Sequence, residues 1–424
     1  MQIPGKQKLD KWLGYLLIVI LLPFTRLLGI VLRRDHSARV APSNILFIKL
    51  LGLGSLIVST DAIQAIRRRF PEARLLLLTD ANIAAGIAPF QLFDEIWQTG
   101  PDSAGFFSTF VNAARFLIRS WRLRQLWVVD LEVYSKLTTV YALLTLARNR
   151  FGFYLAPVPF RKYLNTHNVH FDQSFFLGDN YLFMAQAVTG VNDEAVTGVR
   201  AQTEAGVKAQ TTAAIGDGHE SLPAQRRDEH EKPYIILNNT CSGLATVRKL
   251  PDPVFSEICR WVLGHTSYKL ALLGAPQDKE EIDRFLGNDP VLSGQMDRIL
   301  NFAGEAADAG TTAAGFASYY RFLEEKGVCL VTIDSGPLHI AKKLGLPTLS
   351  IWGPTDPANY LKVHPHEQKR HLSYYLAAPC SPCVHRHEKL PCGGDNFCMK
   401  NIGADAIIGK LQSLLGYLLS PHPT

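Results

Sequence analysis

The sequence lacks the features that mark most nucleic-acid-binding proteins. Its formal net charge is only +6 over 424 residues, and it has no zinc-finger ligand pattern, no aromatic RNA-binding signature and no long run of Lys and Arg. Cysteine is scarce as well, with seven residues and no evident cleavable secretion signal, which favours a reducing compartment. We therefore expect a protein that works in a reducing compartment and has no nucleic-acid partner.

One long hydrophobic segment stands out near the N-terminus. Residues 12–32 are nearly all apolar, with interruptions at Pro23 and Arg26. A membrane-spanning helix needs about 20 apolar residues, so the length barely suffices, and Arg26 opposes a span. Basic residues on both sides, with Trp12 and Tyr15 as aromatic anchors, indicate a helix that lies in the membrane interface. The alternative is an amphipathic helix packed on the protein surface.

Short apolar runs alternate with helical patterns in both halves of the chain. The predicted strands are residues 44–50, 74–79, 126–130, 234–239, 269–274, 328–334 and 348–353. Unbroken apolar strands separated by helices indicate parallel sheets that are covered on both faces. We expect an α/β protein with two Rossmann-like, doubly wound domains facing each other across a cleft, with ligands at the carboxyl ends of the strands.

The composition divides the chain into four segments. Residues 1–39 carry the hydrophobic helix, and residues 40–188 form the first Rossmann-like domain. Residues 189–232 are small, polar and charged without an apolar period, which predicts a disordered linker. Residues 233–424 form the second Rossmann-like domain, which includes a cysteine-rich loop at residues 380–398.

The strongest motif is DSGPLH, followed one strand later by GPTDP. Asp334 ends a predicted strand, and Ser335 and Gly336 make the turn into a helix. Free backbone N–H groups at a helix start, beside a glycine, form an anion site that suits a diphosphate. His339 can donate a hydrogen bond or a positive charge to such a group. Thr355 lies in the second loop, and DSG taken alone is also typical of a helix cap.

A second motif, NNTCSGLATVRKLP (residues 238–251), begins at the end of the strand at residues 234–239 and continues into a loop. Thr240 and Ser242 offer hydroxyls, and Arg248 and Lys249 offer positive charge. This combination suits pyrophosphate binding and the stabilisation of a departing nucleotide. An exposed basic loop without a ligand explains the same residues equally well.

The first strand leads into a glycine turn with an unusual sequence. Gly52 and Gly54 are present, but Ile57 stands where a dinucleotide fingerprint requires its third glycine. Asp80 ends the next strand, where a ribose-binding acid would lie. Two glycines and an acid are a weak signal, so a nicotinamide or flavin enzyme is not favoured.

The C-terminal region contains four closely spaced thiols. Cys380 and Cys383 are followed by Cys392 and Cys398 within one short loop. Four thiolates so close together in sequence are compatible with a structural zinc ion, although the spacing is looser than in well-defined zinc modules. The alternative is a surface loop with free or pairing thiols, and no pattern for a catalytic zinc ion is present.

Together these motifs resemble glycosyltransferase family 9, the lipopolysaccharide heptosyltransferases. The resemblance extends from about residue 44 to residue 415, excluding the linker, and rests on LGLGS, RFPEARLLLLT, VRKLP, DSGPLH and IWGPTDP. It implies a GT-B fold, with the acceptor mainly on the N-terminal domain and a nucleotide sugar mainly on the C-terminal one. It also implies transfer of a heptose from an ADP-heptose to a lipid-anchored saccharide such as a lipopolysaccharide core. Such a reaction inverts the anomeric centre and requires no metal or other cofactor.

The resemblance also assigns roles to residues and a place in the cell. Asp334, Ser335, Gly336 and His339 would hold the diphosphate and ribose of the donor. Arg248 stands where the family usually has a lysine that stabilises the leaving diphosphate, and an arginine keeps the charge with a different geometry. A lipid-linked acceptor and the hydrophobic N-terminus imply a position on the cytoplasmic face of the inner membrane of a bacterium.

Ser55 departs from the family pattern. The family has an acid at this position, beside the acceptor-side glycines 52 and 54, as the general base; serine lacks both the charge and a suitable pKa. Another carboxylate can serve, and the best candidate is Glu132, at the end of the strand at residues 126–130, with Asp61 less favoured. Otherwise the enzyme uses a different donor or acceptor, or the chain is a non-catalytic GT-B module that binds a nucleotide sugar or a partner.

Overall fold

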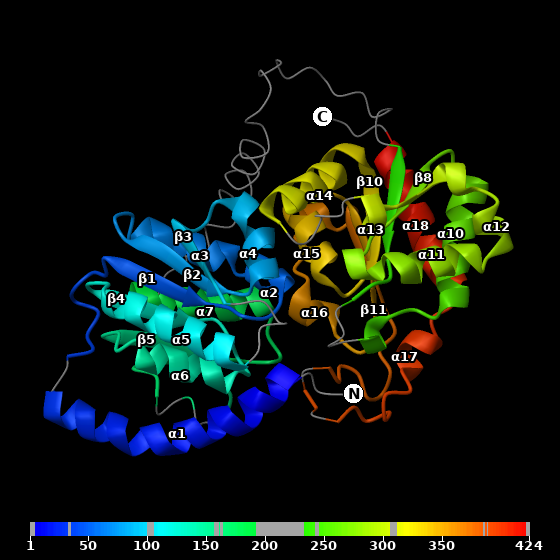
Figure 1. Ribbon diagram of the computed structural model, residues 1–424. Helices are drawn as coiled ribbons and strands as arrows, with labels where there is room; N and C mark the ends of the chain where they lie inside the picture. Colours follow the sequence, from blue (N-terminus) through cyan, green and yellow to red (C-terminus); the bar gives the residue numbers. More distant parts are fainter. Residues whose placement is uncertain are drawn as a thin grey trace, which may run out of the picture. The chain divides into compact units, whose positions relative to one another are not determined.

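The computed structural model contains two compact units, residues 2–211 and residues 212–424, each built around one six-stranded sheet (Figure 1). It describes residues 5–32, 35–99, 106–156, 161, 164–191, 233–241, 246–305, 312–384, 386–387 and 389–420. Most of the predicted linker therefore lies outside the described residues. The predicted domain boundaries stay predictions.

The first unit alternates strands and helices in the predicted way. Its strands are β1 (Asn44–Ile48), β2 (Arg74–Thr79), β3 (Glu95–Gln98), β4 (Leu126–Asp130), β5 (Asn149–Tyr154) and β6 (His167–His170). Its helices are α1 (Gly5–Leu32), α2 (Leu53–Val58), α3 (Thr60–Arg69), α4 (Ala81–Ile87), the 3-10 turn η1 (Ala88–Phe90), α5 (Phe106–Trp121), α6 (Lys136–Leu144) and α7 (Leu177–Thr189).

Every neighbouring pair in this sheet is parallel, in the order β3-β2-β1-β4-β5-β6. The order reverses between β1 and β4, which is where doubly wound sheets bind ligands. Side chains alternate across the sheet, so Leu46 and Ile48 pack with residues of α5 and α6. On the other face, Trp127 contacts Phe70 at the end of α3, and Phe153 contacts α7. Burial on both faces explains why the central strands are unbroken apolar runs.

The second unit repeats the same winding. Its strands are β7 (Tyr234–Asn238), β8 (Lys269–Leu272), β9 (Ile299–Asn301), β10 (Gly327–Ile333), β11 (Thr348–Trp352) and β12 (His371–Tyr375), in the parallel order β12-β11-β10-β7-β8-β9. Its α-helices are α10 (Asp252–His265), α11 (Lys279–Gly287), α12 (Pro290–Ser293), α13 (Phe302–Glu305), α14 (Ala313–Lys326), α15 (Gly336–Lys343), α16 (Pro357–Tyr360), α17 (Phe397–Lys400) and α18 (Ala404–Leu419). The 3-10 turns are η4 (Thr246–Arg248), η5 (Pro276–Asp278), η6 (Met296–Arg298) and η7 (Pro365–Glu367).

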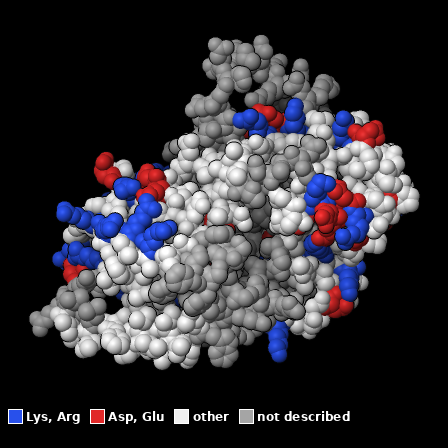
Figure 2. Space-filling model, in the orientation of Figure 1, with Lys and Arg blue, Asp and Glu red and all other residues white. Residues whose placement is uncertain are grey.

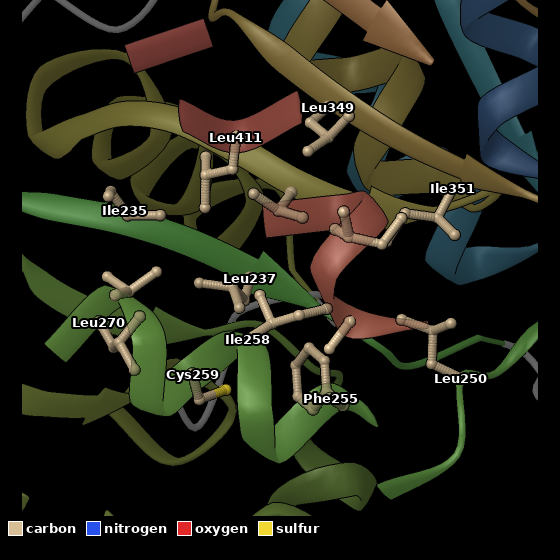
Figure 3. Packing of buried hydrophobic residues seen from close by; sticks show 14 of the residues in the cluster. Ile235, Leu237, Leu250, Phe255, Ile258, Cys259, Leu270, Leu349, Ile351 and Leu411 are labelled. Carbon is tan, nitrogen blue, oxygen red and sulfur yellow. The ribbon is translucent and has the colours of Figure 1, made fainter. Parts of the chain in front are cut away.

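The core of the second unit joins its sheet to α10 and α18. Leu237 and Leu349 of the sheet are fully buried with Ile258 of α10 and Leu411 of α18 (Figure 3). The C-terminal helix α18, which begins at Ala404, thus returns to cover a sheet whose first strand begins at Tyr234. Because one face of α18 is buried, the apolar residues of the segment 404–419 recur with the period of a helix.

The predicted α/β fold class with two Rossmann-like domains is confirmed, but each sheet has more strands than the sequence predicts. The missed strands include β3 (EIWQ), β6 (HNVH) and β9 (ILN), which are short and partly polar. The helical segment between β1 and β2 is two helices, α2 and α3, which are interrupted at Ser59. How the two units face each other stays a prediction.

The predicted N-terminal hydrophobic helix is present as α1. Its residue Ile18 is buried against Val140, Leu143 and Leu164, which places α1 on the outer side of α6. Among the residues that the structure describes, no helix is long and apolar enough to cross a membrane.

Candidate functional site

In the second unit, polar side chains gather where β7 and β10 end. Thr332 lies opposite Asn238 in the parallel register. The amide nitrogen of Asn238 donates to the hydroxyls of Thr332 and Ser335, both at 3.0 Å. The Thr240 hydroxyl donates to the side-chain oxygen Oδ1 of Asn238 at 2.9 Å. Asn238 therefore fixes the first turn of the DSG motif to the neighbouring strand end.

Asp334 is the centre of this cluster. It is buried, and its Oδ2 accepts a hydrogen bond from the Thr355 hydroxyl at 2.7 Å. The same oxygen lies 3.4 Å from Nη1 of Arg248, which also donates to the Asp334 carbonyl oxygen at 3.3 Å. The ends of β10 and β11 thus hold a carboxylate that orients a guanidinium at the edge of the sheet.

The start of α15 provides the predicted anion site. Ser335 is the N-cap residue, and its hydroxyl does not cap the helix because it is engaged with Asn238 and Thr332. A Cβ built on Gly336 would meet no heavy atom within 4 Å, so the backbone there is open to a ligand. Pro337 has no N–H and the Leu338 N–H donates to the Ser335 carbonyl at 3.2 Å, so the Gly336 N–H is the donor of this first turn that is left for an anion.

His339 lies one turn into α15. Burial lowers its pKa, and Arg248 and Lys342 lower it further against the opposing effect of Asp334. The side chain is therefore neutral at neutral pH and acts as a hydrogen-bonding group. Of the two roles that the sequence left open for His339, the structure favours the hydrogen bond over the positive charge.

The two neighbouring cations of the VRKLP motif separate in the structure. The turn η4 directs Arg248 to Asp334, whereas Nζ of Lys249 pairs with Oε1 of Glu281 on α11 at 2.6 Å. Ser242 lies outside the described residues. Lys249 is thus not part of the cluster around Asp334.

Sequence reasoning missed two residues of the cluster, Asn238 and Thr332. Asn238 is a polar residue at the end of a buried strand, which was a usable signal. Thr332 had none, because a single threonine inside an apolar strand is usually a packing residue.

The cysteine-rich loop packs against the end of β11. The backbone N–H of Cys383 donates to the Pro354 carbonyl at 2.9 Å, and Ser381 donates to the Gly353 carbonyl. Burial raises the pKa of Cys383, and the thiols of Cys380 and Cys392 raise it further. Among the described residues no group of three or more His, Cys, Asp or Glu side chains is arranged to hold a metal ion. The structural zinc site stays a prediction.

In the first unit, Glu132 lies where β1 and β4 end. Its Oε1 accepts hydrogen bonds from the backbone N–H groups of Leu50 and Leu51, both at 2.8 Å, and lies 3.2 Å from Nζ of the buried Lys49. Burial is the largest single influence and opposes the charge of Lys49, but Glu132, Tyr181 and Asp130 together outweigh it and raise the pKa of Lys49. One carboxylate thus stabilises the chain where it leaves β1.

Behind Glu132 lies a second buried ion pair. Arg161 and Asp130 are both almost fully buried and form a salt bridge. Arg161 also donates to the Glu132 carbonyl and to the Thr139 hydroxyl of α6, and Thr138 donates to Asp130 at 2.9 Å. The loop between β5 and β6 is thereby fixed to the end of β4. Sequence reasoning missed Arg161, because it lies in a non-periodic loop without a motif.

The glycine turn between β1 and α2 has the conformation that its sequence requires. Gly52 has a φ of 81°, and a Cβ built there would lie 2.9 Å from the Ser55 hydroxyl. That hydroxyl donates to the Gly52 carbonyl at 2.8 Å. Gly54 is buried in the first turn of α2, and the buried Tyr181 of α7 hydrogen-bonds to Ser55. Ser55 therefore stabilises the turn.

Solved structures share this architecture. A glycosyltransferase family 9 protein from Veillonella parvula aligns with a TM-score of 0.60 and 16% identity, covering 90% of this chain and 100% of that chain. E. coli ADP-heptose lipopolysaccharide heptosyltransferase II aligns with a TM-score of 0.60 and 16% identity, covering 89% and 100%. E. coli heptosyltransferase WaaC with ADP aligns with a TM-score of 0.57 and 13% identity, covering 88% and 99%. At such identities the likeness shows the fold, a GT-B-like pair of parallel sheets.

The resemblance predicted from the motifs is also confirmed. The family model described as glycosyltransferase family 9 (heptosyltransferase) matches residues 321–393. This segment contains β10, the DSG turn, α15 and the GPTDP loop. No curated protein matches the sequence.

The buried pair of Arg161 and Asp130 gives a prediction about stability. Replacing Arg161 with methionine leaves Asp130 as an uncompensated buried charge, and we expect the first unit to lose about 3–5 kcal/mol of unfolding free energy. Urea denaturation followed by circular dichroism measures this loss. Arg74→Met is the matched control, because Arg74 forms a largely exposed pair with Glu95 and should cost no more than about 1 kcal/mol. Equal losses in both variants would contradict the importance of the buried pair.

Proposed function

We propose that the protein is an inverting glycosyltransferase. It moves a heptose or related sugar from an ADP-sugar to a lipid-anchored saccharide such as a lipopolysaccharide core. The cluster of Asp334, Thr355, Arg248 and His339 carries this proposal, because it lies at the reversal point of its sheet and mostly within the matched segment. The solved relatives named for ADP-heptose and for complexes with ADP support an ADP-sugar as the donor.

The donor's diphosphate would bind at the start of α15. The open backbone at Gly336 would donate its N–H to a phosphate oxygen, and the neutral His339 would add a hydrogen bond. Arg248, oriented by Asp334, would stabilise the negative charge that develops on the leaving diphosphate. Thr355 would act through Asp334, since its hydroxyl is already engaged there. The proposed reaction requires no metal ion.

On the acceptor side, Glu132 is the proposed general base. Its Oε1 is engaged by Leu50, Leu51 and Lys49, and among the described residues no hydrogen bond reaches Oε2. Oε2 is therefore the atom that would take the proton from the attacking hydroxyl. Only 6% of the side chain is exposed, so the acceptor hydroxyl has to approach closely at the strand end.

A specific observation favours a second candidate function. The Ser55 hydroxyl is used within the turn, where it donates to the Gly52 carbonyl, and offers no carboxylate to an acceptor. If Glu132 likewise only stabilises the turn, the chain is a GT-B module that binds a nucleotide sugar without transferring it.

Turnover separates the two candidates. We expect the full chain, incubated with a panel of ADP-, UDP- and GDP-sugars and a membrane extract that contains truncated lipopolysaccharide, to release ADP from an ADP-sugar. Coupled detection of the released nucleotide measures the reaction. Release from a UDP- or GDP-sugar alone would contradict the proposed donor, and binding without release would support the non-catalytic module.

The donor site gives a prediction about binding. His339→Ala removes a half-buried hydrogen-bonding group at the proposed diphosphate site, and we expect ADP affinity to fall about tenfold. Isothermal titration calorimetry measures the affinity. His265→Ala is the control, since His265 is an exposed residue at the end of α10. Undiminished affinity of the His339 variant would place the donor elsewhere.

The proposed base gives a prediction about rate. Glu132→Gln keeps an amide oxygen for the two backbone N–H groups but cannot accept the proton, so we expect the turnover rate to fall about 10²–10⁴-fold with ADP affinity unchanged. Single-turnover kinetics measure the rate. Asp61→Asn is the matched comparison and should stay near the wild-type rate. The reverse result would identify Asp61 as the base and leave Glu132 with a positioning role.

A further inference from the structure

The helix α1 has two opposite faces that are both apolar. One face packs on α6 through Ile18, with Leu17, Leu21 and Leu22 against the same cluster. The other face is exposed, with side chains between 49% and 73% accessible at Tyr15, Leu16, Val19, Ile20, Phe24, Leu27, Ile30 and Val31. A surface helix of a globular protein normally has polar residues on that side. The outer face of α1 is therefore an apolar surface that the protein itself does not cover.

The exposed residues form a stripe along α1. At 100° per residue they span one half of the helix circumference, on the side away from Ile18, and this half also includes the position of Arg26. Every exposed residue whose side chain is described on α1 is uncharged, and Figure 2 shows uncharged atoms at the lower left, where α1 lies in Figure 1. An apolar patch of this extent marks an interaction site.

An exposed tryptophan next to α6 adds to the apolar surface. Trp121 at the end of α5 is exposed, while its indole N–H donates to the carbonyl of Leu144, a residue that packs against the inner face of α1. An indole with a satisfied N–H and an exposed ring is typical of residues at a membrane–water interface.

The charge of residues 1–39 indicates which kind of partner covers the outer face of α1. The first 39 residues contain seven Lys and Arg (Lys6, Lys8, Lys11, Arg26, Arg33, Arg34 and Arg39) and two acidic residues (Asp10 and Asp35). A second copy of the chain would bring the same positive charge to the contact, whereas anionic lipid headgroups complement it. An apolar stripe flanked by basic residues is typical of helices that lie in the interface of a bilayer.

The attachment of α1 relates this surface to the candidate acceptor site. Gly14 lies against the first residue of α6, where a Cβ would be 2.6 Å from Cβ of Lys136. At the other end, Asp35 pairs with Arg148 just after α6. The two helices therefore run parallel. Because α6 begins after β4, close to Glu132, the N-terminal part of α1 lies at the carboxyl edge of the sheet and extends beyond the start of α6 by about nine residues, or about 13 Å.

We propose that the outer face of α1 is a docking surface for an anionic phospholipid bilayer. The helix lies flat in the headgroup region and holds the carboxyl edge of the first sheet beside the lipid. The placement of the sheet edge beside the lipid rests on the proposed function, because this placement gives a lipid-anchored acceptor direct access to the edge that carries Glu132. The docking itself is independent of catalysis.

Vesicle flotation of the full chain tests the docking. We expect co-flotation with phosphatidylcholine vesicles that contain phosphatidylglycerol, weakened by high salt and by omission of phosphatidylglycerol. A variant with Leu16→Gln, Ile20→Gln and Leu27→Gln should bind at least about tenfold more weakly. The control variant has Val291→Gln, Met296→Gln and Phe397→Gln, three exposed apolar residues of the second unit, and should bind like the wild type.

Several outcomes would overturn the proposal. Equal binding of both triple variants would show that the α1 face is not the contact. A wild type that does not float, and that forms a dimer by light scattering which the α1 variant lacks, would make the face an interface between copies. Thermal melting of each variant checks that it is folded, and surface substitutions of this kind should change stability little.

Photo-cross-linking tests the orientation without any need for turnover. A phospholipid with a photoreactive headgroup should label the exposed residues along α1 from Tyr15 to Val31, together with Trp121. Labels only near one end of α1, or labels on Phe183 of α7 on the other face of the sheet, would contradict a flat helix. Absence of transferase activity in the wild type would remove the proposed function and leave these results standing.

Discussion

The parallel pairing of β7 with β10 is the constraint on which the candidate donor site depends. Because Thr332 lies opposite Asn238, the loops that follow both strands emerge at one edge and come within hydrogen-bonding distance. A slip of one residue would turn the Thr332 side chain to the other face and separate Asn238 from Ser335. The same principle acts at β1 and β4, where Ile48 lies opposite Asp130 and the following residues include Lys49 and Glu132.

The charged residues at the carboxyl edges of the two sheets differ in burial and in pairing. In the first unit, both ion pairs are almost fully buried and their partners are engaged by several hydrogen bonds, so the groups stabilise the chain where it leaves the sheet. In the second unit, 15% of the Arg248 side chain is exposed, and its Nη1 lies 3.4 Å from Oδ2 of Asp334, a longer contact. A partly exposed cation held by one carboxylate is better suited to receive a phosphate, because less desolvation is required.

The sequence predicts the strand ends well and the connections between them poorly. Asp334 and Glu132 could be located because each follows an unbroken apolar run, which is a strong local signal. Arg161 could not, since its partners lie about thirty residues away and become neighbours only through the sheet. Arg248 and Lys249 show the same limit at short range: adjacent residues point to different partners because of one 3-10 turn, whose geometry the motif does not specify.

Ser55 illustrates how one substitution affects a larger network. An acid at this position would add a third buried or half-buried carboxylate beside Asp130 and Glu132, against the positive charges of Lys49 and Arg161. With serine, the two described carboxylates at this edge each pair with one cation, Glu132 with Lys49 and Asp130 with Arg161. The Ser55 hydroxyl stabilises the Gly52 turn by a neutral hydrogen bond. The charge balance therefore favours a well-ordered edge over a reactive one. Proton transfer here has to use a carboxylate that already stabilises the fold, which restricts how far the edge can rearrange during a reaction.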